Sequence, residues 1–136
     1  MRILIVEDEA VGLFVLQKYL EAFGEIETAR DGQRALELFK EALKEGNPFS
    51  LVMMDIMLPK LDGQSVLKEM RESERNCGVK PVEAAKVVMT TALSDPKNII
   101  KAFNEGGADS YLLKPIDKRK LIDELQKIGF TSEVKR

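Results

Sequence analysis

The chain contains no histidine and a single cysteine, Cys77, among its 136 residues. Without histidine, the chain itself excludes a histidine-based zinc site, a Ser-His-Asp triad and a phosphohistidine donor. Any phosphoryl group must therefore come from another molecule. A lone cysteine cannot form an internal disulfide, and the acids that follow residues 1–6 interrupt the apolar stretch that a signal peptide needs. We therefore expect a cytoplasmic protein in which Cys77 is an incidental reduced thiol.

The chain also lacks an excess of basic residues, internal repeats, and apolar runs long enough to cross a membrane. Its formal net charge is -2 and its sequence pI is about 5.4, so the electrostatic attraction that drives nucleic-acid binding is missing. We expect protein or small-anion partners, with neither nucleic acid nor membrane among them. The content of 44% hydrophobic and 32% charged residues is typical of one soluble domain.

Short aliphatic runs alternate with segments whose apolar residues recur at helical spacing. This alternation predicts βα units and a parallel sheet. The strand candidates are four apolar runs and one weaker, alternating stretch that is typical of an edge strand: residues 3–6, 50–54, 86–90, 110–113 and, at the edge, 25–29. Five helices are expected, in the segments that carry the apolar stripes Leu13 to Phe23, Leu36 to Leu43, Val66 to Met70, Ile99 to Phe103 and Leu121 to Ile128.

Local sequence marks some of the boundaries. Ser94-Asp95-Pro96 supplies a cap and a proline at the first helical position, so a helix is expected from there to about Glu105. Asp62-Gly63 precedes a shorter helix. The polar stretch from Arg71 to Lys86 is the longest predicted connection.

Polar residues follow each of the four apolar strand candidates. Glu7 and Asp8 come after the first, Asp55 after the second, Thr91 after the third and Lys114 after the fourth. Because the carboxyl ends of parallel strands meet at one edge of the sheet, we expect three acids, a hydroxyl and an amine to share one pocket there.

The three acids would repel one another, by roughly 4 kcal/mol for two charges about 4 Å apart at an effective dielectric near 20. A divalent cation such as Mg²⁺, or Mn²⁺, would offset this repulsion, since hard cations prefer oxygen ligands. Lys114 can neutralise Asp55 without the metal and a phosphoryl oxygen with it, and the Thr91 hydroxyl can donate to another such oxygen. A carboxylate that faces a metal and a lysine is suited to forming an aspartyl-phosphate, and we predict Asp55 as the nucleophile.

Each polar feature alone also has a purely structural explanation. Glu7-Asp8 could complement the dipole of the following helix, and Asp55 could be a turn residue. Thr91 is a good strand residue, and Lys114-Pro115 could be a polar turn. Their joint occurrence at the ends of successive strands favours a functional pocket.

Five ordered motifs resemble those of the receiver domains of two-component response regulators. They are Val6-Glu7-Asp8-Glu9, Met53 to Pro59, Asp62-Gly63, Met89 to Ala92 and Tyr111 to Pro115. The resemblance runs from Arg2 to about Gly129 and implies a doubly wound, flavodoxin-like α/β fold with five parallel strands in the order 2-1-3-4-5 and five helices. We expect a receiver domain over residues 1–130 and a short C-terminal tail, 131–136, without an output domain.

The resemblance implies roles for the acids. Asp55 would accept a phosphoryl group from the histidine of a sensor histidine kinase or a histidine phosphotransfer protein. Asp8 and Asp55 would be metal ligands. Glu7 would help to hold a metal-bound water, and the backbone carbonyl of Met57 would complete the protein's share of the ligands.

The resemblance also implies a switch. Thr91 and Lys114 would contact the phosphoryl group, the Lys114-Pro115 peptide bond would be cis, and Tyr111 would take up the space that Thr91 vacates on moving inward. Met57 and Leu93 would flank the path of the hydrolytic water, and because both are apolar we expect slow self-dephosphorylation.

The implied target is a protein that recognises the face formed by the helix at 96–105, the strand at 110–113 and the helix at 118–127. It would act in chemotaxis, a phosphorelay or kinase control, with the receiver as a monomer or a phosphorylation-dependent dimer rather than as an enzyme. One alternative is a small-molecule phosphatase of the haloacid-dehalogenase-like kind, but Met57 occupies the position of its second acid. The other is a degenerate receiver that binds partners without phosphate, which the intact acids disfavour.

Overall fold

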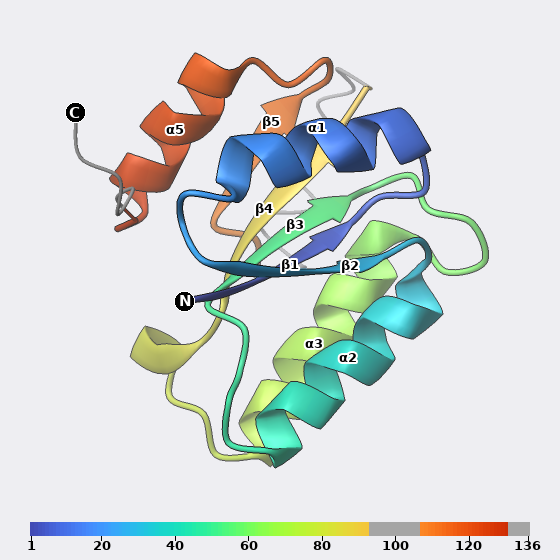
Figure 1. The fold of residues 1–136 in the computed structure, drawn as a ribbon. Helices are drawn as coiled ribbons and strands as arrows, with labels where there is room; N and C mark the ends of the chain where they lie inside the picture. Colours follow the sequence, from blue (N-terminus) through green and yellow to red (C-terminus); the bar gives the residue numbers. More distant parts are fainter. Residues whose placement is uncertain (93–106, 131–136) are drawn as a thin grey trace.

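The structure is a computed structural model, and it describes residues 1–92 and 107–130. Within them, five parallel strands form one sheet in the order β2-β1-β3-β4-β5 (Figure 1). The strands are β1 (Arg2–Val6), β2 (Glu25–Ala29), β3 (Leu51–Asp55), β4 (Lys86–Thr91) and β5 (Ser110–Leu113). The predicted parallel sheet and its strand order are confirmed. The helix predicted at residues 96–105 lies outside the described residues.

The described helices are α1 (Ala10–Leu20), α2 (Gly32–Lys44), α3 (Gly63–Asn76), the short 3-10 helix η1 (Pro81–Glu83) and α5 (Lys118–Lys127). α2, α3 and α5 each begin after an aspartate whose carboxylate accepts a first-turn backbone N–H: Asp31, Asp62 and Asp117. α1 begins after Glu9, whose side chain makes no such bond. Among the described helices, none combines the length and the apolar character that crossing a bilayer requires.

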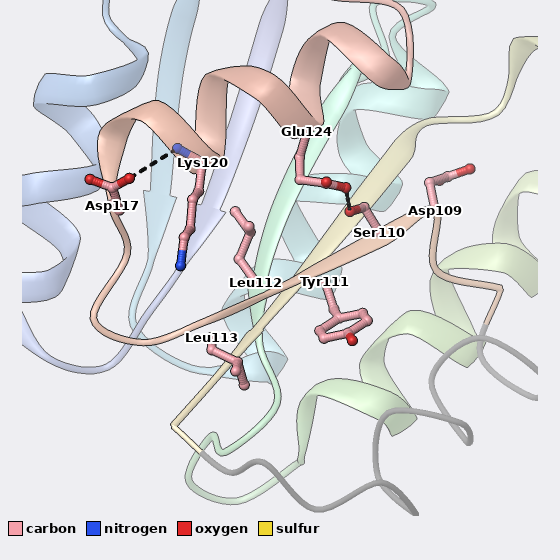
Figure 2. Close-up of a pocket in the computed structure, with 8 residues that line it drawn as sticks. All are labelled: Asp109, Ser110, Tyr111, Leu112, Leu113, Asp117, Lys120 and Glu124. Carbon is pink, nitrogen blue, oxygen red and sulfur yellow. Dashed lines mark hydrogen bonds between the residues drawn. The ribbon is translucent and has the colours of Figure 1, made fainter.

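Two apolar layers cover the opposite faces of the sheet. α1 and α5 lie over one face, and α2 and α3 lie over the other (Figure 1). Because side chains alternate along a strand, Ile5 packs with α1 and α5 whereas Val6 packs with α2 and α3. Figure 2 shows the same alternation on β5, where Leu112 points toward α5 and Tyr111 points away from it. β1 and β3 are almost wholly buried, and β2 is partly exposed, as expected for an edge strand.

α3 is longer than its apolar residues predicted. It extends to Asn76, so residues 71–76, expected in a connection, are helical. The extension is stabilised by an ion pair of 2.9 Å between Arg71 and the buried Glu74, and the Glu74 carboxylate also accepts the backbone N–H of Ala85 at 2.8 Å. The prediction of a short helix was wrong because a buried charged pair does not appear in an apolar stripe.

Gly63 allows α3 to start directly beside the end of β3. Its backbone N–H donates to the Ile56 carbonyl at 2.9 Å, and a Cβ at this position would lie 2.2 Å from the Asp55 carbonyl oxygen. Only glycine permits so close an approach of two backbone segments. The glycine therefore fixes the chain that follows Asp55 against the start of α3.

Candidate functional site

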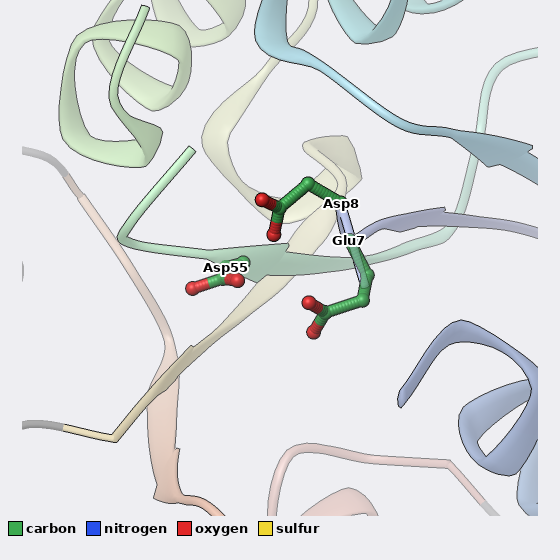
Figure 3. Close-up of side chains that lie close together, drawn as sticks. All are labelled: Glu7, Asp8 and Asp55. Carbon is green, nitrogen blue, oxygen red and sulfur yellow. The ribbon is translucent and has the colours of Figure 1, made fainter. Parts of the chain in front are cut away.

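Three carboxylates meet at the carboxyl edge of the sheet. Glu7 and Asp8 follow β1, and Asp55 ends the neighbouring strand β3, in which Met54 is the register partner of Val6. One carboxylate oxygen from each of the three acids lies within 4.8 Å of the others (Figure 3). Glu7 and Asp55 are buried, and Asp8 is exposed. The structure thus brings together the three acids that the sequence singled out.

Lys114 neutralises part of the charge of this cluster. It follows β5, and its Nζ lies 2.8 Å from Glu7 Oε1 and 2.9 Å from Asp55 Oδ2. Its backbone N–H donates to the Thr91 carbonyl at 2.7 Å, which joins the ends of β4 and β5. The Lys114-Pro115 peptide bond is cis, as the resemblance implies. One ammonium among three carboxylates leaves the cluster net negative.

Burial and charge shift the pKa values of two of these groups. Burial raises the pKa of Glu7, and the charge of Asp55 raises it further, although the hydrogen bond from Lys114 opposes both effects. For Lys114, burial lowers the pKa, but its bonds to Glu7 and Asp55 outweigh burial and the pKa is raised. Both pKa values are raised, so Glu7 and Lys114 each bind a proton more strongly than usual. The site therefore favours added positive charge.

The Asp55 carboxylate is held at both of its oxygens. Oδ1 accepts the backbone N–H of Met57 at 2.9 Å, and Oδ2 accepts a hydrogen bond from Lys114. A carboxylate oxygen has two lone pairs, so each retains capacity for a further partner. The side chain therefore has a fixed orientation and can still bind a cation.

The other residues predicted for the site lie on or near the adjacent strands. Thr91 is fully buried and ends β4, which runs one residue further than expected. Tyr111 lies on β5 and packs against the layer that contains α2 and α3. Met57, two residues after Asp55, is 59% exposed. Leu93 lies outside the described residues.

The donor set fits a hard divalent cation. All three acids offer carboxylate oxygens, which are the ligands that Mg²⁺ prefers, and the exposure of Asp8 leaves room for the waters that Mg²⁺ retains. Because the cluster stays net negative with Lys114 in place, a bound cation would relieve the remaining repulsion.

Two arginines hold loops of this fold through main-chain carbonyls, and neither was among the predicted site residues. Arg30, which follows β2, donates to the backbone carbonyl of Asp8 from Nη2 at 2.7 Å and from Nε at 3.1 Å. Arg71 on α3 donates to the Gly107 carbonyl from Nη2 at 2.8 Å. A bond from an arginine to a distant main-chain carbonyl produces no spacing pattern, so neither contact was detectable from the sequence.

A groove lies between β5 and α5. Its lining residues are Asp109, Ser110, Tyr111, Leu112, Leu113, Asp117, Lys120 and Glu124 (Figure 2). The Ser110 hydroxyl donates to the Glu124 carboxylate across the groove, and this bond lowers the pKa of Glu124 against the opposing effect of burial. Leu113 is 47% exposed. The groove lies on the face that the resemblance assigns to protein partners.

The chain was compared with known protein families, and one of them matches almost its whole length. Residues 3–126 match the family described as "Response regulator receiver domain". The chain belongs to this family. Its members are signalling domains of two-component systems, and the acidic pocket of Glu7, Asp8 and Asp55 is typical of a receiver's phosphoacceptor site.

Curated relatives carry receiver domains within longer chains. This receiver is 36% identical over 123 residues to the osmosensing histidine protein kinase SLN1 of Saccharomyces cerevisiae, a match that covers 89% of the chain and 9% of that protein. It is 35% identical over 121 residues to the transcriptional regulatory protein SrrA of Staphylococcus aureus, covering 88% of the chain and 44% of that protein. The chain spans less than half the length of these relatives.

Solved receiver structures share the fold. A chain of the CheX-CheY-BeF3-Mg²⁺ complex from Borrelia burgdorferi is similar with a TM-score of 0.79 at 27% identity, covering 94% of this chain and 88% of that chain. The CheY-like receiver domain protein from Methanospirillum hungatei is similar with a TM-score of 0.74 at 28% identity, covering 93% of this chain and 91% of that chain. The flavodoxin-like fold is therefore confirmed.

Proposed function

We propose that this receiver is a phosphorylation-dependent switch in which Asp55 accepts the phosphoryl group. The supporting observation is the setting of Asp55, whose carboxylate lies beside those of Glu7 and Asp8 and accepts a hydrogen bond of 2.9 Å from Lys114. An ammonium at this distance can exchange its bond to the carboxylate for one to a phosphoryl oxygen while it stays in the pocket.

The proposed donor is a phosphohistidine of a sensor histidine kinase or a histidine phosphotransfer protein. An oxygen of Asp55 attacks the phosphorus, the P–N bond to the donor histidine breaks, and its electron pair stays with the imidazole. Lys114 then neutralises one phosphoryl oxygen, and the Thr91 hydroxyl donates to another.

Four residues would hold the cation in this proposal. Asp8 and Asp55 are the direct carboxylate ligands, the Met57 backbone carbonyl is a third ligand, and Glu7 fixes a metal-bound water. When bound, Mg²⁺ or Mn²⁺ supplies the positive charge that stabilises the transferred group. The net negative charge of the three-carboxylate cluster supports this assignment.

Incubation of the protein with acetyl phosphate and Mg²⁺, followed by intact-mass measurement, tests the acceptor. One phosphoryl group per chain is expected, and none in Asp55→Asn or after chelation of the metal. Asp62→Asn is the matched control, because Asp62 is an exposed acid that caps α3 and asparagine caps equally well. Modification of a residue other than Asp55 contradicts the proposal. Steady turnover of small phosphate esters would instead indicate an aspartyl-phosphate phosphatase.

We also propose that the donor docks on the first turns of α1. Val11 is 75% exposed and Phe14 is 58% exposed, and α1 starts directly after the loop that carries Glu7 and Asp8. Apolar side chains left in water beside a reactive site are typical of a protein contact. Phe14→Ser should slow transfer from a phosphohistidine donor while leaving phosphorylation by acetyl phosphate unchanged. Equal slowing with both donors would contradict this surface.

The proposed output is a change in the face that includes β5 and α5, which the resemblance extends to residues 96–105, outside the described residues. The phosphoryl group would draw Thr91 toward it, and Tyr111 would take up the vacated space, so that phosphate favours one of two pre-existing states. The groove between β5 and α5 and the exposed side chain of Leu113 support a protein contact here. We propose that the target acts in chemotaxis, a phosphorelay or kinase control.

A pull-down with and without beryllofluoride tests this output face. A partner captured only with beryllofluoride is expected, and Leu113→Asp should abolish its capture. Val82→Asp is the matched control, because Val82 is 86% exposed on η1, which precedes β4 at the opposite edge of the sheet. A partner that binds equally well without beryllofluoride would contradict the switch.

We propose slow self-dephosphorylation, because Met57 and Leu93 offer no polar group to a hydrolytic water. Met57→Asn and Leu93→Asn should each speed the loss of phosphate, measured by intact mass over time. An unchanged rate in the double variant would contradict this role.

A further inference from the structure

Arg30 fastens the loop that carries Asp8 to the end of β2. It directly follows Ala29, the last residue of β2, and its guanidinium donates to the Asp8 backbone carbonyl from Nη2 at 2.7 Å and from Nε at 3.1 Å. Hydrogen bonds from a charged donor are stronger than those between neutral groups, and a guanidinium that binds through two N–H groups fixes direction as well as distance.

Within the described residues, few other hydrogen bonds hold the loop between β1 and α1. The Glu7 N–H donates to the Ala29 carbonyl at 3.0 Å, which continues the ladder between β1 and β2. Beyond it, the Glu9 N–H reaches the Glu7 carboxylate at 3.3 Å, and the Glu9 side chain does not cap α1. α2, α3 and α5 each have a capping aspartate. The Leu13 N–H donates to the Glu9 carbonyl at 2.9 Å, which holds the start of α1. The Asp8 carbonyl, one residue earlier, is held by Arg30.

We propose that Arg30 is a positioning residue of the metal site, which holds the Asp8 main chain so that the Asp8 carboxylate stays within reach of those of Glu7 and Asp55. This inference rests on the proposed function, because it concerns Mg²⁺ binding. Asp8 is the exposed member of the cluster, so its backbone rather than its packing has to orient the side chain. Residues that orient a metal ligand change metal affinity without touching the metal.

Because Arg30 is positively charged, its removal changes Mg²⁺ affinity in opposite directions under the two explanations. The guanidinium is a cation bound to the main chain of Asp8, and like charges repel, so electrostatics alone predicts that removing it tightens Mg²⁺ binding. Positioning predicts the opposite, because the binding of Mg²⁺ would then have to order a loosened Asp8.

Calorimetric Mg²⁺ titrations of the full chain compare Arg30→Met and Arg30→Lys with the wild type. Arg30→Met should raise the Kd for Mg²⁺ about tenfold, the lower end of the effects seen for residues that support metal ligands. Arg30→Lys keeps the charge and one donor, so it should raise the Kd less. Arg34→Met is the matched control, because it removes an exposed arginine of α2 that pairs with Glu37 at 3.2 Å. It should leave the Kd for Mg²⁺ unchanged, because an exposed pair of this kind contributes little to stability and lies on α2.

Tighter or unchanged Mg²⁺ binding in Arg30→Met overturns the inference. Amide hydrogen exchange in the metal-free protein gives a second measurement, in which Asp8 and Glu9 should exchange faster in Arg30→Met than in the wild type or Arg34→Met. An unchanged exchange rate overturns the proposal that Arg30 positions Asp8, and it leaves the proposed function intact. Absence of Mg²⁺ binding by the wild type overturns the proposed function and, with it, the metal role of Arg30.

Discussion

The Lys114 ammonium binds the Asp55 carboxylate at 2.9 Å, although 59 positions separate the two residues along the chain. They meet because β3 and β5 end at the same edge of the sheet, with β4 between them. The same ammonium reaches Glu7 at 2.8 Å, so one cation serves two buried carboxylates. Lys114 therefore balances charge that a bound Mg²⁺ would otherwise balance.

Replacing Lys114 by methionine should destabilise the domain and strengthen its metal binding. Without the ammonium, two carboxylates stay buried without a counter-ion, which should lower the unfolding free energy at pH 7 by about 3 kcal/mol. The pocket also becomes more negative, so Mg²⁺ should bind more tightly than in the wild type. Urea unfolding in the presence of a chelator and at saturating Mg²⁺ measures both effects.

The control for this change is Lys118→Met, which removes an exposed lysine at the start of α5. It should alter neither stability nor metal binding. A Lys114→Met protein that is destabilised equally with and without Mg²⁺ would show that the ammonium and the cation do not compete for the same charge.

The stability of the fold should depend on pH through Glu124. The hydrogen bond from Ser110 lowers the pKa of Glu124, against the effect of burial. A carboxyl group with a lower pKa in the folded chain stabilises the fold above its unfolded pKa, and this contribution is lost as the pH falls through the folded pKa. Ser110→Ala should therefore raise the Glu124 pKa and cost about 1 kcal/mol of stability at pH 7.

NMR titration of the Glu124 carboxyl carbon measures the pKa, and urea unfolding at neutral and acidic pH measures the stability. The difference between Ser110→Ala and the wild type should shrink in acid. Lys127 also lowers the Glu124 pKa, but its side chain is 72% exposed, so Lys127→Met should raise that pKa less than Ser110→Ala does. An unchanged pKa in Ser110→Ala would remove Glu124 as the cause of the pH dependence.

Much of the sheet and of the acidic pocket could be predicted because burial leaves a local pattern. β1 and β3 are covered on both faces and read as continuous apolar runs, so the acids that end them stand out. The edge strand β2 was predicted from a weaker alternation of apolar and polar residues. Periodicity did not give the order of the strands, which came from the family motifs.

The remainder depends on contacts that leave no such pattern. Arg71 and Glu74 extend α3 through a buried ion pair, yet charged residues indicate solvent exposure in any periodicity argument. Arg30 acts on the pocket through a main-chain carbonyl of Asp8, and every residue has such a carbonyl. Side-chain chemistry alone therefore could not reveal either arginine.

Two glycines near helix starts should respond in opposite ways to alanine. At Gly63, the new Cβ would lie 2.2 Å from the Asp55 carbonyl oxygen, so α3 must shift and stability should fall by about 2 kcal/mol. At Gly12, in α1, the nearest atom is Glu7 Cδ at 3.4 Å, an ordinary contact. Alanine there should add about 0.5–1 kcal/mol, because it loses less backbone entropy in a helix. Urea unfolding of the two variants gives the signs, and stabilisation by Gly63→Ala would show that the contact with Asp55 is not restrictive.

Lys60 has a left-handed backbone conformation, with φ of 70°, in the loop between β3 and α3. Among the described residues it is the one non-glycine residue with a positive φ. A side chain in this region costs roughly 1–2 kcal/mol, whereas glycine adopts it freely.

Lys60→Gly should therefore stabilise the domain, since the relief of strain exceeds the entropy that glycine adds to the unfolded chain. That entropy offsets roughly 0.4–1 kcal/mol, which leaves a net gain of about 0.5–1 kcal/mol in urea unfolding. Lys68→Gly is the matched control: Lys68 is an exposed lysine in the interior of α3, where glycine should cost about 1 kcal/mol. A loss of stability in both variants would mean that the Lys60 side chain makes contacts that outweigh its backbone strain.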